Sequence, residues 1–356
     1  MVNHDESPTP KVSVVCAWYN RADYIRDTVD SLLAQDLGDF EVVIVNDGST
    51  DPRVAQVLDS YDDPRLRVIH QKNTGFVGAI RRAISEAKAP IIATQGAGDI
   101  SFAERLRLQF EYLHRNPTCV GVGCLREQCT IDQDGKVGEV VITGIPREGI
   151  TRDDFLLSNS FTHGEVMFRR SEYEQVGGYR EFFRFAQDRD LWLRLSELGT
   201  FSLIPEVLYQ RRTFEADGVS ASAKKVLTQQ TLSVFARQCA THRDRWGSDP
   251  VDMYGMQAGL FRDKDRRLAN LYAKMSAKYL YYGHLNSASI LARKSIDESI
   301  TTKGVLVLGL TAISSVSKSF QQLAKWVIGR IGFKDRRAFE PIVSEKRVGW
   351  LRDRHS

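Results

Sequence analysis

Two groups of polar residues stand at the ends of short apolar segments near the start of the chain. Tyr19 and Asn20 follow the first segment, and the run Asn-Asp-Gly-Ser-Thr-Asp at 46–51 follows the second. Two parallel strands joined by a helix bring both strand ends to one edge of a sheet, where ligands bind. Polar groups gathered at that edge predict a nucleotide-binding site.

A third polar group, residues 71–78, lies between an apolar segment and a helical pattern, and it contains two glycines. Glycine lets the backbone approach a ligand closely, and a helix N-terminus offers free amide donors to phosphate. Arg81 and Arg82 lie one turn into this helix. They either reach a pyrophosphate or lie on a solvated outer face.

Acidic residues follow two further elements. Asp99 comes after the apolar segment 91–95, and Asp188 and Asp190 precede an apolar helical stripe that begins at Leu191. Acids in the first turn of a helix are stabilised by the helix dipole, so a purely structural pair is one interpretation. A carboxylate that accepts a proton from a reacting hydroxyl is the other.

The elements that must position these residues alternate between strand and helix. Strands are predicted at 12–15, 40–45, 66–70, 91–95, 119–125 and 203–210, with a short helix before 157. Asp23 is expected to cap the first helix, and the pattern Ser-Phe-Ala-Glu at 101–104 predicts a capping box. The alternation predicts an α/β domain with a mostly parallel sheet flanked by helices.

Length and composition bound the remaining possibilities. A chain of 356 residues is too long for one ordinary hydrophobic core, which predicts two domains. Its net charge of +4, with acidic and basic residues interspersed, does not favour nucleic-acid binding. The five cysteines have no metal-ligand spacing, and an odd number favours a reducing compartment. Residues 1–10 are expected to be disordered and are neither a signal peptide nor a membrane span. We therefore expect a cytoplasmic protein, with the inner face of the membrane as a further location.

The opening segment resembles family 2 glycosyltransferases of the GT-A fold. The family shows a Tyr-Asn pair after the first strand and an Asp-Asp-Gly-Ser-Thr-Asp run after the second, and both patterns stand here at 17–20 and 46–51. A further family motif, N-x-G-x-x-x-A, is matched by Asn73, Gly75 and Ala79. The resemblance implies a nucleotide-sugar site, such as one for a UDP-sugar, made of Ala17, Tyr19, Asn20, Asn46, Asp47, Asn73, Gly75, Arg81 and Asp99.

The family's D-x-D motif, whose carboxylates bind a divalent cation on the donor phosphates, falls on Gly96 and Gly98. The resemblance implies a Mg²⁺ or Mn²⁺ cofactor held by Asp99 and His163. Asp99 is the one carboxylate that remains, and a hard cation prefers several oxygen ligands. The departure therefore predicts donor binding that is helped by metal but does not require it.

Two later segments resemble the acceptor side of the family's cleft. Residues 160–170 contain His163, which would contact a diphosphate or a metal, or else be a satisfied structural residue. Residues 187–195 resemble the pattern E-D-x-D-L-W-L-R-L, with Gln in place of Glu. The resemblance implies that Asp188 is the catalytic base and that Asp190 and Trp192 lie on the acceptor or diphosphate side.

The resemblance places a GT-A glycosyltransferase domain at 11–215 and leaves a helical region at 216–356 without a recognised motif. Within that region, stripes at 268–279 and 288–296 predict a helical hairpin. A basic amphipathic helix at 317–334 is expected either to lie in a membrane interface or to dock on its own domain.

The resemblance implies an inverting glycosyltransferase that moves a sugar from a nucleoside-diphosphate donor to an acceptor hydroxyl. The acceptor would be a glycan, a lipid-linked sugar or another hydroxyl compound in cell-surface polysaccharide synthesis. The alternative is an inactive nucleotide-sugar-binding domain with a regulatory or scaffold role, which the two glycines and Gln187 motivate. A dinucleotide-dependent oxidoreductase is disfavoured, because no G-x-G-x-x-G motif follows the first strand.

Overall fold

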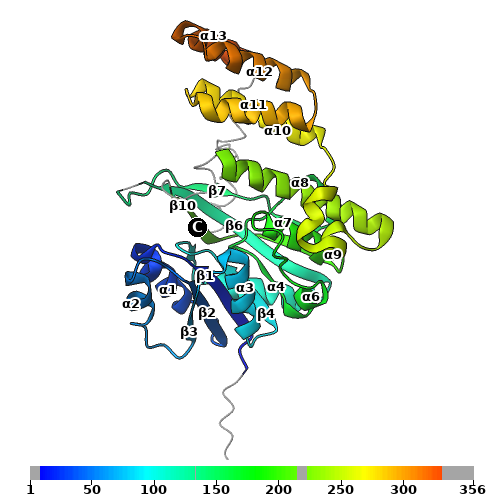
Figure 1. The fold of residues 1–356 in the computed structure, drawn as a ribbon. Helices are drawn as coiled ribbons and strands as arrows, with labels where there is room; N and C mark the ends of the chain where they lie inside the picture. Colours follow the sequence, from blue (N-terminus) through cyan, green and yellow to red (C-terminus); the bar gives the residue numbers. More distant parts are fainter. Residues whose placement is uncertain (1–8, 133, 215–222, 331–356) are drawn as a thin grey trace, which may run out of the picture. The chain divides into compact units, whose positions relative to one another are not determined.

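The computed structural model describes residues 9–132, 134–214 and 223–330. These residues form two compact units, one containing the described residues up to 214 and the other those from 223 onward (Figure 1).

A single mixed sheet forms the centre of the first unit, with strand order β3-β2-β1-β4-β9-β6-β10-β5. The pairs β1–β2, β1–β4, β2–β3 and β6–β10 are parallel, whereas β9 is antiparallel to both β4 and β6. The strands are β1 (Val12–Trp18), β2 (Phe40–Asp47), β3 (Leu66–Gln71), β4 (Ile91–Gln95), β5 (Ile100–Ser101), β6 (Cys119–Ile131), β7 (Val141–Thr143), β8 (Arg147–Ile150), β9 (Met167–Arg169) and β10 (Thr200–Phe214). The predicted mostly parallel sheet is confirmed.

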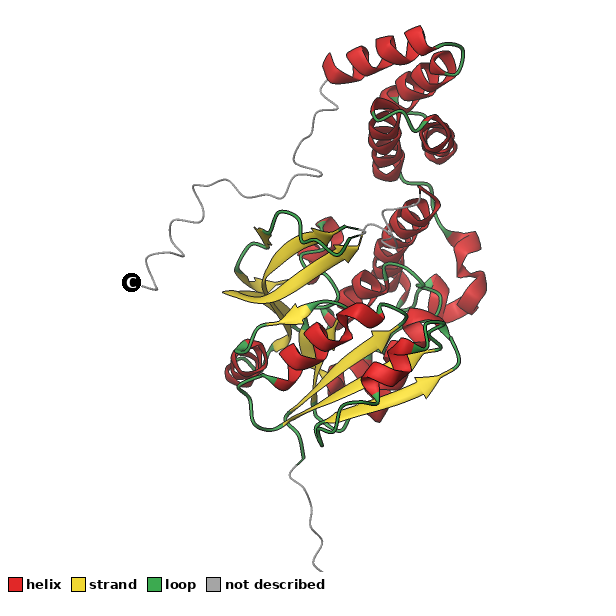
Figure 2. Cartoon of the chain, turned by 90° about the vertical axis from the view of Figure 1, so that its left-hand side faces the viewer, coloured by secondary structure: helices red, strands yellow, loops and turns green. Residues whose placement is uncertain are grey.

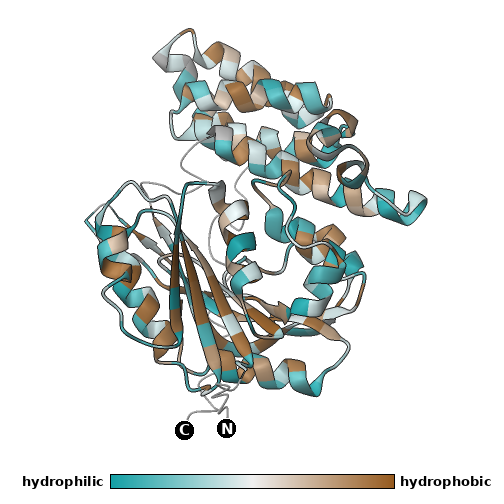
Figure 3. Cartoon of the chain, turned by 60° about the horizontal axis from the view of Figure 1, so that its bottom comes forward, coloured by the Kyte–Doolittle hydropathy of each residue, from teal (hydrophilic) through white to brown (hydrophobic). Residues whose placement is uncertain are grey.

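Helices flank this sheet (Figure 2). They are α1 (Ile25–Leu33), α2 (Arg53–Leu58), α3 (Gly75–Glu86), α4 (Arg105–Arg115), α5 (Arg152–Leu157), α6 (Arg170–Gln175) and α7 (Gln187–Leu195). Val12, Val14 and Cys16 of β1 share one core cluster with buried residues of α1, α2 and α4. Because side chains alternate along a strand, Val15 points to the opposite face, and α3 contacts β1 and β2. Covered on both faces, the central strands are apolar over most of their length (Figure 3).

Two helix starts differ from the sequence predictions. Asp23 lies in a short 3-10 turn, η1 (Ala22–Tyr24), and α1 begins after it without a side-chain cap. Ser101 does not cap α4, because it lies in β5 and donates its hydroxyl hydrogen to Oε1 of Gln95 at 2.8 Å. The pairing of β5 with β10 takes priority over the local capping pattern. A capping box does form at α5, on Thr151.

The second unit is helical. It contains α8 (Ala223–Trp246), α9 (Pro250–Tyr254), η3 (Gly255–Phe261), α10 (Arg266–Tyr281), α11 (Leu285–Glu298), α12 (Thr302–Ser314) and α13 (Lys318–Arg330). The predicted hairpin is the pair α10–α11, which is separated at Gly283, a residue with φ of 88°. No helix in the described ranges is long and apolar enough to cross a bilayer.

The helix α13 covers most of the segment predicted as basic and amphipathic. Its Ala324 and Ile328 are buried in a cluster with Ala277, Leu280 and other residues of α10, α11 and α12. The apolar stripe therefore docks within its own unit, as one of the two alternatives predicted. Residues 331–334, which complete the predicted segment, lie outside the described residues.

All five cysteines are buried free thiols. Burial raises the pKa of Cys124 to about 12, and it raises the pKa of Cys16 further above its ordinary value. These side chains pack as small apolar groups.

Candidate active site

The polar groups at the ends of β1 and β2 contact each other. The backbone N–H of Asn20 donates to Oγ of Ser49 at 2.8 Å, and Oδ1 of Asn20 accepts the N–H of Thr50 at 2.9 Å. The parallel register sets this meeting, because Trp18 lies opposite Asn46 in the neighbouring strand. Asn20 therefore ties the first predicted motif to the second.

Asp47 and Asn73 join the ends of β2 and β3. Asp47 is buried, and its Oδ1 accepts hydrogen bonds from Nε2 of Gln71 and from the N–H of Thr74, each at 2.8 Å. Nδ2 of Asn73 donates to the carbonyl of Asp47 at 2.8 Å. A Cβ on Gly48, which has φ of 65°, would stand 2.5 Å from the Asn73 nitrogen, so only glycine fits there.

The remaining predicted donor residues lie on the same edge. The side chain of Tyr19 is 46% exposed, and Ala17 is half-buried. Nδ2 of Asn46 lies 3.0 Å from Nδ1 of His70. Gly75 is the first residue of α3 and has φ of 79°. These strand ends meet because β1, β2 and β3 pair in parallel. Together they form a polar rim with an exposed aromatic ring.

Arg81 and Arg82 lie on the exposed side of α3. Arg81 pairs with Glu181 at 2.9 Å, and Arg82 pairs with Glu86 at 2.7 Å. Both arginines line a surface pocket that contains none of the polar strand ends. The structure therefore favours the outer-face alternative for both residues over contact with a pyrophosphate.

Asp99 is buried and held at both oxygens. Its Oδ2 accepts the hydroxyl hydrogen of Tyr209 at 2.7 Å, and its Oδ1 accepts the N–H of Arg212 at 2.8 Å. Burial raises the pKa of this carboxyl group, while the two hydrogen bonds act in the opposite direction. Tyr209 and Arg212 come from β10, far along the chain.

The loop at 96–99 does not fit a divalent cation held by protein carboxylates. A Cβ on Gly96 would stand 2.1 Å from Oδ2 of Asp99, and one on Gly98 would stand 2.7 Å from Cζ of Phe214. The space that side chains would need at the two D-x-D positions is thus filled. Within the described ranges, no three His, Cys, Asp or Glu side chains gather in a way that could hold a metal.

His163 is not brought into a metal site with Asp99. Its Nε2 shares a hydrogen bond of 2.7 Å with the hydroxyl of Tyr179, and its ring packs edge-on against Phe76 with centroids 5.1 Å apart. Burial lowers the pKa of His163 to about 4, so the ring is neutral at physiological pH. The predicted metal pair Asp99–His163 is therefore corrected to two separately hydrogen-bonded side chains.

Asp188 lies in the first turn of α7 and is half-buried. Its Oδ2 accepts a hydrogen bond from Nδ2 of Asn159 at 3.1 Å. Burial raises the pKa of Asp188, against the opposing effect of bonds from Arg189 and Asn159. Burial and the nearby negative charge of Asp188 raise the pKa of Tyr179, the hydrogen-bond partner of His163.

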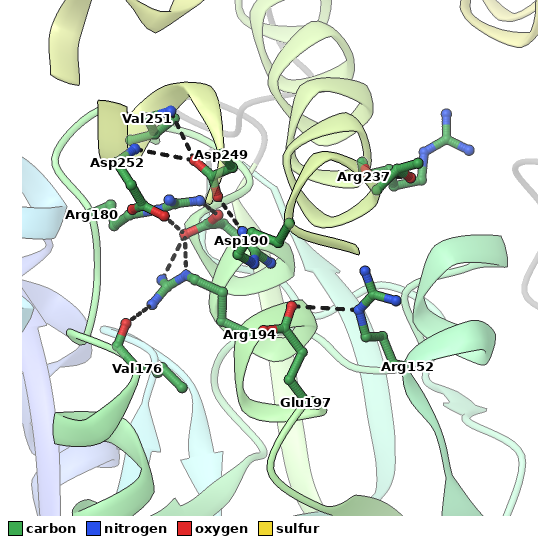
Figure 4. Close-up of polar contacts among 12 residues, drawn as sticks. Arg152, Val176, Arg180, Asp190, Arg194, Glu197, Arg237, Asp249, Val251 and Asp252 are labelled. Atoms are coloured by element: carbon green, nitrogen blue, oxygen red, sulfur yellow. Dashed lines mark hydrogen bonds and ion pairs between the residues drawn. The ribbon is translucent and has the colours of Figure 1, made fainter. Parts of the chain in front are cut away.

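Asp190 and Trp192 are structural residues, in place of the acceptor-side roles predicted for them. The carboxylate of Asp190 is buried between two guanidinium groups, that of Arg180 and that of Arg194, with Nη2 of Arg194 at 2.7 Å (Figure 4). Trp192 is fully buried and packs against Phe168. Helical geometry turns position 190 inward, because it lies about half a helical turn from position 188.

An arginine at the end of β1 also belongs to the site and was not predicted. Nη1 of Arg21 donates to the carbonyl of Ala97 at 2.8 Å, and its guanidinium lies 4.3 Å from the centre of the Phe214 ring. Asn20 and Arg21 both have left-handed backbone conformations, with φ of 55° and 58°. The only sequence signal was its position directly after the Tyr-Asn pair.

Comparisons of sequence identify the family of the chain. The model of the family described as "Glycosyl transferase family 2" matches residues 13–177. EpsE of Bacillus subtilis (strain 168), which carries a glycosyltransferase name, is 32% identical over 211 residues, covering 57% of this chain and 73% of EpsE. A chondroitin synthase of Pasteurella multocida (strain Pm70) is 29% identical over 222 residues, covering 62% of this chain but only 22% of the synthase.

A solved structure shares the fold. The S. aureus TarS fragment 1–349 superposes with a TM-score of 0.52 at 14% identity, covering 86% of this chain and 91% of the fragment. The mostly parallel sheet, the flanking helices and the motifs at the strand ends are those of the GT-A fold. The chain therefore belongs to glycosyl transferase family 2.

Proposed function

We propose that this protein transfers a sugar from a nucleoside-diphosphate donor to an acceptor hydroxyl, with inversion at the anomeric carbon, in cell-surface polysaccharide synthesis. Membership of the family supports the transferase activity. The names of relatives, among them a chondroitin synthase, support a polysaccharide or related glycan as the acceptor. The observation that carries the proposal is the hydrogen bond by which Asn159 holds the carboxylate of Asp188 in the first turn of α7.

The donor would lie along the rim formed by the ends of β1, β2 and β3. Tyr19 offers an exposed ring for a base, and Asn73 and Asp47 would hold the base and ribose. TarS has also been solved with UDP, at a TM-score of 0.50 to this chain, which makes UDP a reasonable first probe. The bonds from Gln71 and Thr74 would hold Asp47 in a fixed orientation before the donor arrives.

Asp188 would act as the general base. As the acceptor oxygen bonds to the anomeric carbon, the bond from that carbon to the diphosphate breaks and the diphosphate leaves with the electron pair. The acceptor proton passes to the carboxylate of Asp188. Burial makes this carboxylate a stronger base than an exposed one, because it raises the pKa. Asn159 would orient the carboxylate by its hydrogen bond.

We further propose a cytoplasmic location at the inner face of the membrane. With Ala324 and Ile328 docked, contact with lipid would rest on Lys325, Trp326 and Arg330, which are exposed on α13. Co-sedimentation with anionic vesicles tests this contact, and no binding of the intact protein would exclude it.

The decisive experiment is a transfer assay on Asp188→Asn after a thermal-shift panel has identified a binding nucleotide sugar. The variant should lose about 10²–10⁴-fold in rate with donor affinity nearly unchanged. Asp153→Asn is the control, because Asp153 is an exposed acid in the first turn of α5. Donor binding without transfer by the parent protein would instead favour the inactive binding domain.

A further inference from the structure

We propose that three arginines, Arg21, Arg211 and Arg212, take the place of the divalent cation and stabilise the donor diphosphate directly. This arginine cluster would make donor binding independent of metal. The inference deepens the proposed function and rests on it for one point, namely that the donor is a nucleoside diphosphate. It is carried by the geometry of the loop at 96–99.

The first observation is that the two D-x-D positions are glycines whose side-chain space is occupied. The Asp99 carboxylate lies where a side chain at Gly96 would begin, with 2.1 Å between Oδ2 and that Cβ. The ring of Phe214 lies where a side chain at Gly98 would begin. These two positions therefore lack carboxylates and also lack the space for them, because Asp99 and Phe214 occupy it.

The second observation is that both oxygens of Asp99, the one acid of this loop, already accept hydrogen bonds. Its two oxygens accept hydrogen bonds from the hydroxyl of Tyr209 and from the N–H of Arg212. It is also buried, at 9% exposure. A hard cation would need these oxygens and several more oxygen ligands, which the described side chains around the loop do not supply.

The third observation is the position of the guanidinium of Arg21. It donates to the carbonyl of Ala97, in the middle of the same loop, and it lies over the ring of Phe214 that fills the space beside Gly98. A fixed positive charge thus stands against the loop that would otherwise carry the metal ligands. The left-handed backbone at Asn20 and Arg21 directs the chain to this place.

The local charge balance agrees with an anion site. Arg211 and Arg21 are both within electrostatic reach of Asp99, and Arg212 pairs with the exposed carboxylate of Asp27 at 2.7 Å. Arg21 and Arg211 therefore place positive charge near Asp99, while the guanidinium group of Arg212 is paired with Asp27. A loop with three acids would repel a diphosphate unless a cation intervened, whereas this arrangement attracts one. Guanidinium groups also match phosphate oxygens in geometry.

Titration calorimetry of the full chain tests the inference, with UDP, GDP, ADP and CDP as probes, in EDTA and separately in Mg²⁺ or Mn²⁺. We expect at least one diphosphate to bind in EDTA with Kd within about threefold of its value in metal, a difference of under 1 kcal/mol. Arg21→Gln and Arg211→Gln should each weaken that binding by about tenfold or more, and the matching nucleoside by much less. The second variant is needed because Arg21 also donates a hydrogen bond to the carbonyl of Ala97, so that Arg21→Gln changes a contact of the loop as well as a charge.

Arg115→Gln provides the matched control, because Arg115 pairs with Glu111 on the exposed surface of α4. It should leave the diphosphate affinity unchanged. Loss of all diphosphate binding in EDTA, with recovery in Mn²⁺, would overturn the inference and leave the proposed function standing. Metal-independent binding that neither Arg21→Gln nor Arg211→Gln weakens would overturn the role of the arginines. Absence of nucleotide binding under every condition would overturn the proposed function and the inference together.

Discussion

Asn159 donates a hydrogen bond of 3.1 Å from Nδ2 to Oδ2 of Asp188, which connects the segment after α5 to the first turn of α7. A hydrogen bond to the ionised carboxylate lowers its pKa. Asn159→Ala should therefore raise the pKa of Asp188. The acidic limb of the pH profile of kcat/KM should move to higher pH, as measured in a transfer assay.

The neighbouring exposed residue Ser158 supplies the control for this prediction. Ser158→Ala should leave the acidic limb in place. An unchanged limb in Asn159→Ala, with normal folding, would show that Asp188 does not control that limb.

Gly96 has no space for a side chain. In Gly96→Ala the new methyl group would start 2.1 Å from Oδ2 of Asp99 and 3.1 Å from the hydroxyl of Tyr209, so the loop must shift. Overpacking of this kind costs about 1–3 kcal/mol in the free energy of unfolding, which urea denaturation measures.

Gly38→Ala is the matched control, because its Cβ would meet nothing within 4 Å. If Asp99 is the obstacle, the double variant Gly96→Ala/Asp99→Ser should lose less than the sum of the two single changes. Strict additivity would place the obstacle elsewhere.

Asp190 is buried with the guanidinium groups of Arg180 and Arg194 (Figure 4). Replacing it by Asn leaves positive charge buried without its partner, and we expect a loss of about 3–5 kcal/mol in the free energy of unfolding. Urea denaturation at pH 7 measures this loss. A loss under about 1 kcal/mol would contradict the structural role assigned here.

The same residue predicts a pH dependence of stability. Burial acts to raise the pKa of Asp190, but the charges of Arg194 and Arg180 prevail and hold it below the ordinary value of 3.8. Its contribution is therefore complete above the ordinary value and is lost as the pH falls through the depressed one. The parent protein should lose stability more steeply than Asp190→Asn as the pH falls below about 4.

The docking of α13 predicts different costs for two residues of one helix. Ile328 is 5% exposed and Leu323 is 47% exposed. Ile328→Ala should destabilise the helical unit by about 2–5 kcal/mol, whereas Leu323→Ala should change its stability by at most about 0.5 kcal/mol. Thermal unfolding followed by circular dichroism distinguishes them, and equal costs would argue against the docked arrangement.

The sheet could be predicted from local sequence because strands covered on both faces need nearly continuous apolar residues. Residues 40–45 and 91–95 satisfy this requirement on their own, and both form strands. The strands β6 and β10 extend well beyond the predicted 119–125 and 203–210. Their polar outer ends are strands because they pair with each other, which no local pattern reveals.

The site was predictable where a motif is local and unpredictable where it depends on distant pairing. The contact of Asn20 with residues 49–51 follows from two neighbouring parallel strand ends and the turn after the second strand. The hydrogen bond from Tyr209 to Asp99 joins residues 110 positions apart, so the sequence around Asp99 could not indicate it. For Asp190 and Trp192, the resemblance to the family motif suggested a role on the acceptor or diphosphate side, but both side chains are buried.

The five buried thiols have a practical consequence for spectroscopy. Thiol-reactive dyes and spin labels need an accessible thiolate, and burial both shields these sulfur atoms and raises the pKa of Cys16, Cys119, Cys124 and Cys129. A single cysteine introduced at an exposed position, such as Ser60, would therefore label selectively in the native protein. Site-specific probes can thus be attached without first removing any native cysteine.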